Sequence, residues 1–317
     1  MFVTYSLFIA GFYFLIKGAN WLIEGSSSIA KKFRVSDLMI GLTIVSFGTS
    51  SPELFVNLIA SFNGNSDLAI ANIVGSNISN ILLILGIAAI IYPLTVKKGT
   101  TSTAIPLNML AVVALWLLVN DVLIDGGSLS VLTRIDGFIL LLFFFIFIYY
   151  TFGITKVEGS KEYVEEKNTF ISIMMVLAGI VGLGFGGKWI VDGAIDIATK
   201  FNMSESLIGL TIVAIGTSLP ELVTSAVAAF KHNADIAIGN VIGSNIFNIF
   251  WILGLSSVVK PLFFSDSLNF DIYFMGVVTL LLLLFVFIGR KNQLGRSEGI
   301  LLVLIYILYL IYTIYRG

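Results

Sequence analysis

The sequence of this chain contains two copies of one unit. A shift of 168 positions superimposes the first half on the second without a gap from about residue 11 to residue 94. Residues 40–54 read IGLTIVSFGTSSPEL and residues 208–222 read IGLTIVAIGTSLPEL, so that twelve of fifteen positions are identical. Any fold of this chain must therefore be built from two equivalent halves.

Apolar stretches recur along both copies. Each has roughly 17–25 mostly apolar residues, the length that an α-helix needs to cross a bilayer. Hydrophobic residues make up 57% of the 317 positions and the mean hydropathy is +1.01, which is typical of membrane proteins and not of soluble domains. The sequence predicts an all-α polytopic membrane protein with about ten transmembrane helices near residues 2–20, 37–61, 68–92, 104–120, 134–152, 169–188, 205–230, 234–258, 270–289 and 298–315. Residues 21–35 and 189–203 are amphipathic, and they either continue the preceding helices or lie at the membrane surface.

Five helices in each copy make the second copy enter the membrane from the opposite side. Such inverted repeats are characteristic of many secondary transporters. We expect a first five-helix repeat at 1–152, a short cytoplasmic linker at 153–168 and a second, inverted five-helix repeat at 169–317. Twelve lysines and arginines fall in loops on one side and five on the other. The positive-inside bias then predicts a multi-pass protein of the cell membrane with both termini extracytoplasmic.

Composition argues against several classes of function. The chain has no cysteine, which excludes disulfides, thiolate catalysis and cysteine-ligated metals. Its net charge of −1 argues against a nucleic-acid partner. It lacks the Gly-x-Ser-x-Gly, HExxH and paired-aspartate motifs of hydrolases, so we expect neither an enzyme nor a cofactor. The expected partners are small inorganic cations and the lipid bilayer, and the oligomeric state is left open.

Glu53 and Glu221 lie near the middle of apolar helices at equivalent positions of the two copies. An ionised carboxylate at that depth costs at least a few kcal/mol unless something compensates its charge. No lysine or arginine falls within either helix or within the helix that follows it. The alternatives are protonation and a bound cation, and we favour the cation.

A proline stands directly before each glutamate. Pro52 and Pro220 lack an N–H and obstruct the hydrogen bond to the carbonyl four residues earlier, at Gly48 and Gly216. Broken helices of this kind are tolerated in membranes where the freed backbone lines a cavity or binds an ion. A simple kink would explain the prolines, but not the glutamates beside them.

Further oxygen-bearing side chains share faces with these carboxylates. Helical spacing brings hydroxyl groups toward each glutamate, and the two sets are Thr49, Ser50 and Glu53, and Thr217, Ser218 and Glu221. The following helices carry polar residues at intervals of four, namely Asn72, Ser76 and Asn80, and Asn240, Ser244 and Asn248. Contact between helices is an alternative role for such stripes, above all for Asn72 and Asn240.

The ligand types favour hard cations. Calcium takes roughly six to eight oxygen ligands in flexible geometry, and the chain offers no thiolates and a single histidine for softer metals. Two carboxylates are balanced either by one Ca²⁺ or by two Na⁺. The two ions would then exclude each other from overlapping sites, which is the physical basis of antiport.

Glycines recur every seven residues on the first and sixth predicted helices. Gly11, Gly18 and Gly25 form one stripe, and Gly179, Gly186 and Gly193 form the other. Such stripes permit close backbone approach. We hypothesise that the two helices slide or rock to alternate access, and static close packing is the alternative.

The motifs quoted above resemble those of the sodium/calcium exchanger branch of the calcium/cation antiporters. The residues that carry the resemblance are GTSSPE at 48–53, GSNISN at 75–80, GTSLPE at 216–221 and GSNIFN at 243–248. The family's two alpha-repeats look like residues 36–92 and 204–260, and the similarity extends over nearly the whole chain. The resemblance implies a ten-helix fold that exchanges Na⁺ for Ca²⁺ at ion sites clustered at mid-membrane.

The resemblance also implies a set of ion ligands. Its side chains are Thr49, Ser50, Glu53, Ser76, Asn80, Thr217, Ser218, Glu221, Ser244 and Asn248, with backbone carbonyls of Ser46 and Ala214. In the family, the two glutamates would hold Ca²⁺ together with the carbonyls of Thr49 and Thr217. The first and sixth helices would be the moving pair.

One position departs from the family pattern. Asn248 stands where many prokaryotic and potassium-dependent members carry aspartate. The departure argues against potassium dependence and leaves two acidic groups in the expected site. Proton-coupled relatives typically show a glycine-asparagine pattern before the glutamate, so GTS-x-P-E favours sodium. A Ca²⁺/H⁺ antiporter is the alternative, followed by a K⁺-dependent Na⁺/Ca²⁺ exchanger and a cation channel.

Overall fold

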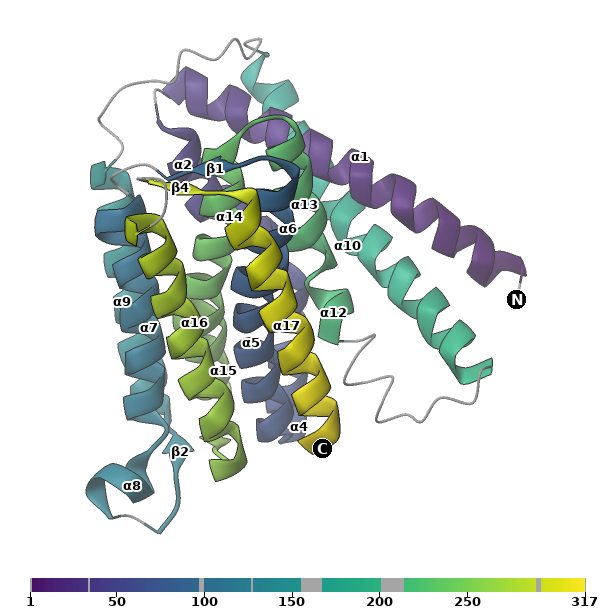
Figure 1. Ribbon diagram of the computed structural model, residues 1–317. Coiled ribbons are helices and arrows are strands. Elements are labelled where there is room, and N and C mark those ends of the chain that lie inside the picture. Colours follow the sequence, from purple (N-terminus) through teal and green to yellow (C-terminus); the bar gives the residue numbers. More distant parts are fainter. Residues whose placement is uncertain are drawn as a thin grey trace.

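The computed structural model describes residues 2–33, 35–96, 100–126, 128–154, 167–200, 214–288 and 292–316, which are almost entirely helical (Figure 1). The predicted linker at 153–168 and the start of the second alpha-repeat at 204–213 fall largely outside these residues. The first half contains α1 (Phe2–Phe33), α2 (Asp37–Ile40), the π-helical turn η1 (Gly41–Val45), α3 (Ser46–Thr49), α4 (Ser51–Asn63), α5 (Ser66–Ser79), the π-helical turn η2 (Asn80–Ile84), α6 (Leu85–Ile91), β1 (Leu94–Thr95), the π-helical turn η3 (Thr100–Ala104), α7 (Ile105–Leu118), α8 (Asp121–Asp125), β2 (Val131–Leu132) and α9 (Arg134–Ile154). The second half contains α10 (Thr169–Lys200), α12 (Ala214–Thr217), α13 (Leu219–Phe230), α14 (Ala234–Ile246), the π-helical stretch η5 (Phe247–Leu253), α15 (Gly254–Val259), β3 (Leu262–Phe263), the 3₁₀ turn η6 (Asp266–Leu268), α16 (Asn269–Ile288), β4 (Gln293–Leu294) and α17 (Arg296–Arg316).

The described helices account for the ten predicted spans. Seven are long and apolar enough to cross a membrane, and an eighth span is the pair Asp37–Thr49 and Ser51–Asn63, bent by 49°. Two shorter apolar helices, Ser102–Leu118 and Leu219–Phe230, stand at the remaining positions. The prediction of a polytopic helical protein is confirmed. The amphipathic residues after the first and sixth spans continue those helices, because α1 runs to Phe33 and α10 to Lys200.

Two short antiparallel strand pairs show that the halves are inverted. Leu94 of β1 pairs with Leu294 of β4, and Leu132 of β2 pairs with Leu262 of β3. The shift of 168 residues converts β1 into β3, so the two pairs are equivalent. They lie at opposite ends of the bundle, with β1 and β4 at the top and β2 at the bottom of Figure 1.

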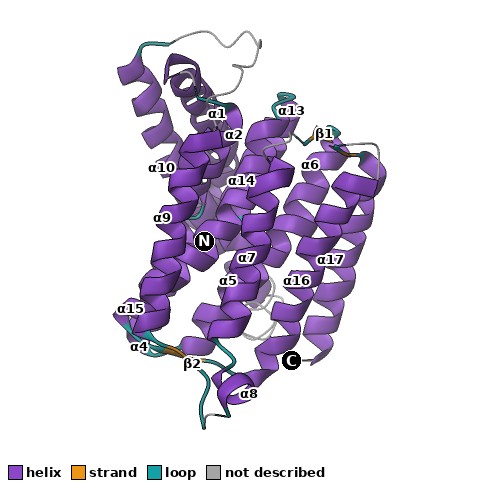
Figure 2. Ribbon diagram, turned by 90° about the vertical axis from the view of Figure 1, so that its left-hand side faces the viewer, coloured by secondary structure: helices purple, strands orange, loops and turns teal. Residues whose placement is uncertain are grey.

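The centre of the bundle is formed by the α14–η5–α15 and α5–η2–α6 spans, which are the most buried of the long helices. Figure 2 shows α14 between α9 on one side and α6 on the other. The outer helices α9, α16 and α17 instead expose large apolar side chains, among them Tyr149, Tyr273 and Leu308. An apolar exterior around a core with buried polar groups is the arrangement of a protein in a bilayer.

The helices α1 and α10 lie side by side at an angle to the rest of the bundle (Figure 1). Their predicted glycine stripes face each other. A methyl group at Gly18 would lie 2.9 Å from the Gly179 carbonyl oxygen, and one at Gly11 would lie 2.8 Å from that of Gly186. Larger side chains would therefore force these two backbones apart.

Candidate cation-binding site

The second span and its counterpart in the other repeat break at equivalent serines. Ser50 (φ −82°, ψ 6°) separates α3 from α4, and Ser218 (φ −88°, ψ 5°) separates α12 from α13. A proline follows in the first turn of α4 and of α13, where its missing N–H costs no helical hydrogen bond. Glu53 and Glu221 therefore stand in the first turn of a new helix, and its N-terminal end stabilises negative charge.

Both glutamates are completely buried, with exposed fractions of 0% and 1%. Neither forms an ion pair with a lysine or arginine in the described part of the chain, where ion pairs involve Glu24, Asp196 and Asp271.

Hydrogen bonds join the two glutamates into one site. Ser50, which belongs to the same repeat as Glu53, donates to Oε1 of Glu221 at 2.8 Å. Ser76 lies 3.5 Å from Oε1 of Glu53 and 2.9 Å from the Ser218 hydroxyl of the other half. The first repeat thereby places a hydroxyl on the carboxylate of the second, and the second repeat places the Ser218 hydroxyl on Ser76, which lies beside Glu53.

Among the described residues, the buried oxygens without a hydrogen-bond donor include four that are related in pairs by the repeat. These four are Oε2 of Glu53 and of Glu221, and Oδ1 of Asn80 and of Asn248. All four are acceptors. An acceptor buried without a partner costs about 1–3 kcal/mol, and more when it is charged, so this group of oxygens matches a desolvated cation.

The segments that carry the two asparagines place them beside the glutamate helices. η2 begins at Asn80 and packs against α13, which contains Glu221. η5 contains Asn248 and packs against α4, which contains Glu53. π-helical turns inside α-helices are frequent at functional sites.

Contacts are defined for three of the other expected ligands, Ser244, Thr49 and Ser46. Ser244 lies 3.5 Å from Oε1 of Glu221. The Thr49 hydroxyl donates to Oδ1 of Asn240 at 3.0 Å and approaches the Ser46 carbonyl at 3.3 Å. That carbonyl also accepts the backbone N–H of Ser50 at 2.9 Å. Thr217 is half-buried, and Ala214 is the first residue of α12.

Asn240 makes contacts between helices, the alternative role considered for it. Its Nδ2 donates to the Ser225 hydroxyl at 2.9 Å, while its Oδ1 accepts from Thr49 of the other repeat. Nδ2 of Asn72, its counterpart, is buried and has no hydrogen-bond partner among the described residues. The two equivalent residues therefore differ in their bonding.

Sequence reasoning missed Asn77 and Asn245. Their side chains cross the interface between repeats, each Nδ2 donating to the backbone carbonyl of the other residue at 3.2 and 3.3 Å. Oδ1 of Asn245 accepts Nδ2 of Asn80, and Oδ1 of Asn77 accepts Nδ2 of Asn248, both at 2.9 Å. The duplicated Gly-Ser-Asn triplets were the available signal, but both asparagines lie off the stripe of spacing four.

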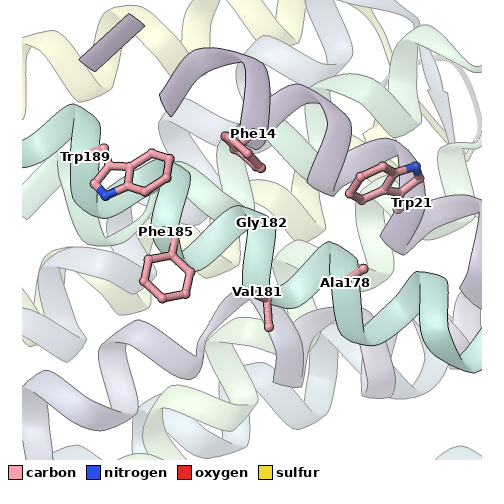
Figure 3. A pocket seen from close by; sticks show the side chains of 7 residues that line it. All are labelled: Phe14, Trp21, Ala178, Val181, Gly182, Phe185 and Trp189. Atoms are coloured by element: carbon pink, nitrogen blue, oxygen red, sulfur yellow. The ribbon is translucent and has the colours of Figure 1, made fainter. Parts of the chain in front are cut away.

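Two of the pockets formed by the described residues lie along α10, and one of them borders the two helix breaks. The first, of about 230 Å³, borders the two helix breaks and is lined by Pro52, Val56, Gly184, Gly187, Lys188, Val191, Asp192, Gly216, Thr217 and Pro220. The second, of about 390 Å³, lies between α1 and α10 and is lined by Phe14, Trp21, Ala178, Val181, Gly182, Phe185 and Trp189 (Figure 3). The second pocket is wholly apolar, so it offers nothing to an inorganic cation.

The chain is similar to known membrane proteins over almost its full length. A family model described as "Sodium/calcium exchanger protein" matches residues 3–153 and 171–315. The sodium/calcium exchanger MaX1 of Methanosarcina acetivorans is 32% identical, over 96% of each chain. The inner membrane protein YrbG of Escherichia coli is 35% identical, over 95% of this chain and 94% of its own.

Solved structures of the sodium-calcium exchanger NCX_Mj share the fold. The structure soaked without Na⁺ and Ca²⁺ superimposes with a TM-score of 0.84 at 32% identity, covering 98% of this chain and 99% of that one. The structure soaked with 2.5 mM Na⁺ and 0.1 mM Ca²⁺ gives a TM-score of 0.82 at 33% identity, covering 96% and 97%.

Proposed function

Because the chain belongs to the sodium/calcium exchanger family, we propose that this cation antiporter exchanges Na⁺ for Ca²⁺ by alternating access. The observation that carries the proposal is the group of four donor-free buried oxygens, contributed in pairs by the two repeats. Carboxylate and amide oxygens of this kind are ligands for Ca²⁺ and Na⁺. In this proposal Glu53 and Glu221 bind the ions directly.

The remaining expected ligands complete the proposed shell. They are the side chains of Thr49, Ser50, Ser76, Asn80, Thr217, Ser218, Ser244 and Asn248 and the backbone carbonyls of Ser46 and Ala214. One Ca²⁺ or two Na⁺ would neutralise the two carboxylates, whereas both loads together would leave excess positive charge in a low-dielectric site. Competition between the ions therefore follows from the charge of the site.

The proposal includes a membrane orientation. The repeats occupy residues 1–152 and 169–317, and the linker at 153–168 lies in the cytoplasm of a cell whose plasma membrane holds the protein. Both termini are then extracytoplasmic. The distribution of basic residues between the loops supports this arrangement.

Flux through reconstituted vesicles tests the function. Proteoliposomes loaded with Na⁺ and diluted into Na⁺-free medium should accumulate ⁴⁵Ca²⁺, because the outward Na⁺ gradient drives the exchange. Vesicles loaded with choline should not. Uptake driven by a pH gradient in place of the Na⁺ gradient would assign the protein to Ca²⁺/H⁺ antiport, and a requirement for K⁺ would assign it to K⁺-dependent exchange.

A further inference from the structure

We propose that Asn77 and Asn245 are positioning residues, which orient the amides of Asn248 and Asn80 so that each presents its oxygen to the cation. The inference rests on the proposed function, because it concerns the same ions. It assigns a role to two side chains that are not themselves ligands.

The backbone carbonyls of Asn77 and Asn245 fix the direction of the hydrogen bonds in this network. The backbone carbonyl of Asn245 only accepts hydrogen bonds, so the Asn77 amide must turn its Nδ2 toward it, at 3.2 Å. Oδ1 of Asn77 then points the other way, toward Asn248. Asn248 must answer with its own Nδ2, at 2.9 Å.

The consequence is that Oδ1 of Asn248 faces away from the Asn77 amide, where it is buried and has no donor in the described part of the chain. The equivalent chain of bonds runs from the Asn77 carbonyl through Asn245 to Asn80, at 3.3 and 2.9 Å. If the Asn248 amide turned over, its Oδ1 would face Oδ1 of Asn77 and its N–H groups would face the cation. The same would happen at Asn80, whose Oδ1 would then face that of Asn245. Each orientation is therefore set by the backbone of one repeat through a side chain of the other.

The same geometry explains why an amide suits position 248. An ionised aspartate there would set a carboxylate oxygen against Oδ1 of Asn77, which accepts and cannot donate. Asn77 could turn over to donate to it, but would then face the Asn245 carbonyl with an oxygen. The orientation of Asn77 thus favours a group at position 248 that donates a hydrogen bond, as the amide does.

A double-mutant cycle tests the proposal by equilibrium ⁴⁵Ca²⁺ binding to the purified full-length protein. Asn77→Ala should weaken Ca²⁺ binding about tenfold, because the Asn248 amide loses its orientation. Asn248→Asp should lower the affinity when residue 77 is asparagine and raise it when residue 77 is alanine, since a carboxylate presents an oxygen in either orientation. A residue that only fills space would not make the effect of Asn248→Asp depend on position 77.

The equivalent cycle, Asn245→Ala with Asn80→Asp, provides a second reading if one variant fails to fold, and thermal unfolding without Ca²⁺ checks the fold of each protein. Unchanged Ca²⁺ affinity in folded Asn77→Ala, or an equal effect of Asn248→Asp in both backgrounds, would overturn the positioning role. If the unmodified protein binds no ⁴⁵Ca²⁺, the proposed function itself fails.

Discussion

The cation site and the α1–α10 pair are held together in opposite ways. In the site, side chains of the two repeats exchange hydrogen bonds across the interface, as Asn77 and Asn248 do. In the pair, the glycine stripes of α1 and α10 meet backbone to backbone. The difference indicates that the site is fixed by directional bonds, whereas the middle of the pair is held by shape. Hydrogen bonds join the two helices near their ends, where Ser172 donates to Ser28 at 2.9 Å and Lys200 donates to Tyr5 at 2.5 Å.

The two ends of the pair also differ. Glu24 on α1 lies 2.9 Å from Lys167 and 3.0 Å from Lys231, which directly follows α13. The equivalent residue of α10 is Asp192, which lines the pocket beside the helix breaks and forms no ion pair within the described residues. We call the Glu24 end of the pair the closed end, because ion pairs tie it to Lys167 and Lys231. The proposed alternating access predicts such an asymmetry for a single state.

The largest effect should come from the site. Glu53→Gln and Glu221→Gln keep the shape of each side chain but remove one of the two charges that balance Ca²⁺. We expect ⁴⁵Ca²⁺ uptake in either variant to fall at least a hundredfold, to background, because a buried charge pairing is worth several kcal/mol. Glu298→Gln at the start of α17 makes the same chemical change outside the site and should transport normally. Full uptake in both site variants would remove the glutamates from the mechanism.

A smaller but still severe effect should follow from the glycine stripe. Gly18→Leu and Gly186→Leu would wedge α1 and α10 apart, since even a methyl group there meets backbone atoms within 2.9 Å. We expect turnover to be abolished while equilibrium Ca²⁺ binding stays within about threefold, a difference of less than 1 kcal/mol. Gly276→Leu on α16 is the control, because a methyl group there would meet Val112 at an ordinary contact distance of 3.6 Å and the position lies outside both the stripes and the pocket beside the helix breaks. Normal transport in both stripe variants would reject the idea that the pair moves.

The weakest effect should come from the closed end. Glu24→Gln removes two partly exposed ion pairs, each worth about 0–1 kcal/mol, so the transport rate should change by only a few-fold. Asp192→Asn should change it less, since Asp192 has no ion pair to lose within the described structure. The rate at which a thiol reagent labels a cysteine introduced near Lys231 would measure the exposure of the Glu24 end. This labelling rate should rise in Glu24→Gln and stay unchanged in Asp192→Asn. Equal labelling of both variants would show that the asymmetry of the two ends has no influence on access.

The sequence was sufficient for the symmetric features of this molecule. Periodicity and duplication predicted the spans, the paired helix breaks and the glutamates, because each depends on residue type and spacing alone. The sequence could not predict that equivalent residues of the two repeats form different hydrogen bonds. Ser50 and Ser218 occupy the same motif, yet Ser50 donates to Glu221 while Ser218 bonds to Ser76. Such choices depend on contacts between the halves, as does the role of Asn77 and Asn245, whose partners lie more than 160 residues away along the chain.

The most direct test of the central claim is competition between the two ions at equilibrium. ⁴⁵Ca²⁺ bound to the purified protein should be displaced as Na⁺ replaces choline at constant ionic strength, with a dependence on Na⁺ steeper than that of a single site. Ca²⁺ binding that is unaffected by Na⁺ would contradict the account, because the two ions would then not share the carboxylates of Glu53 and Glu221.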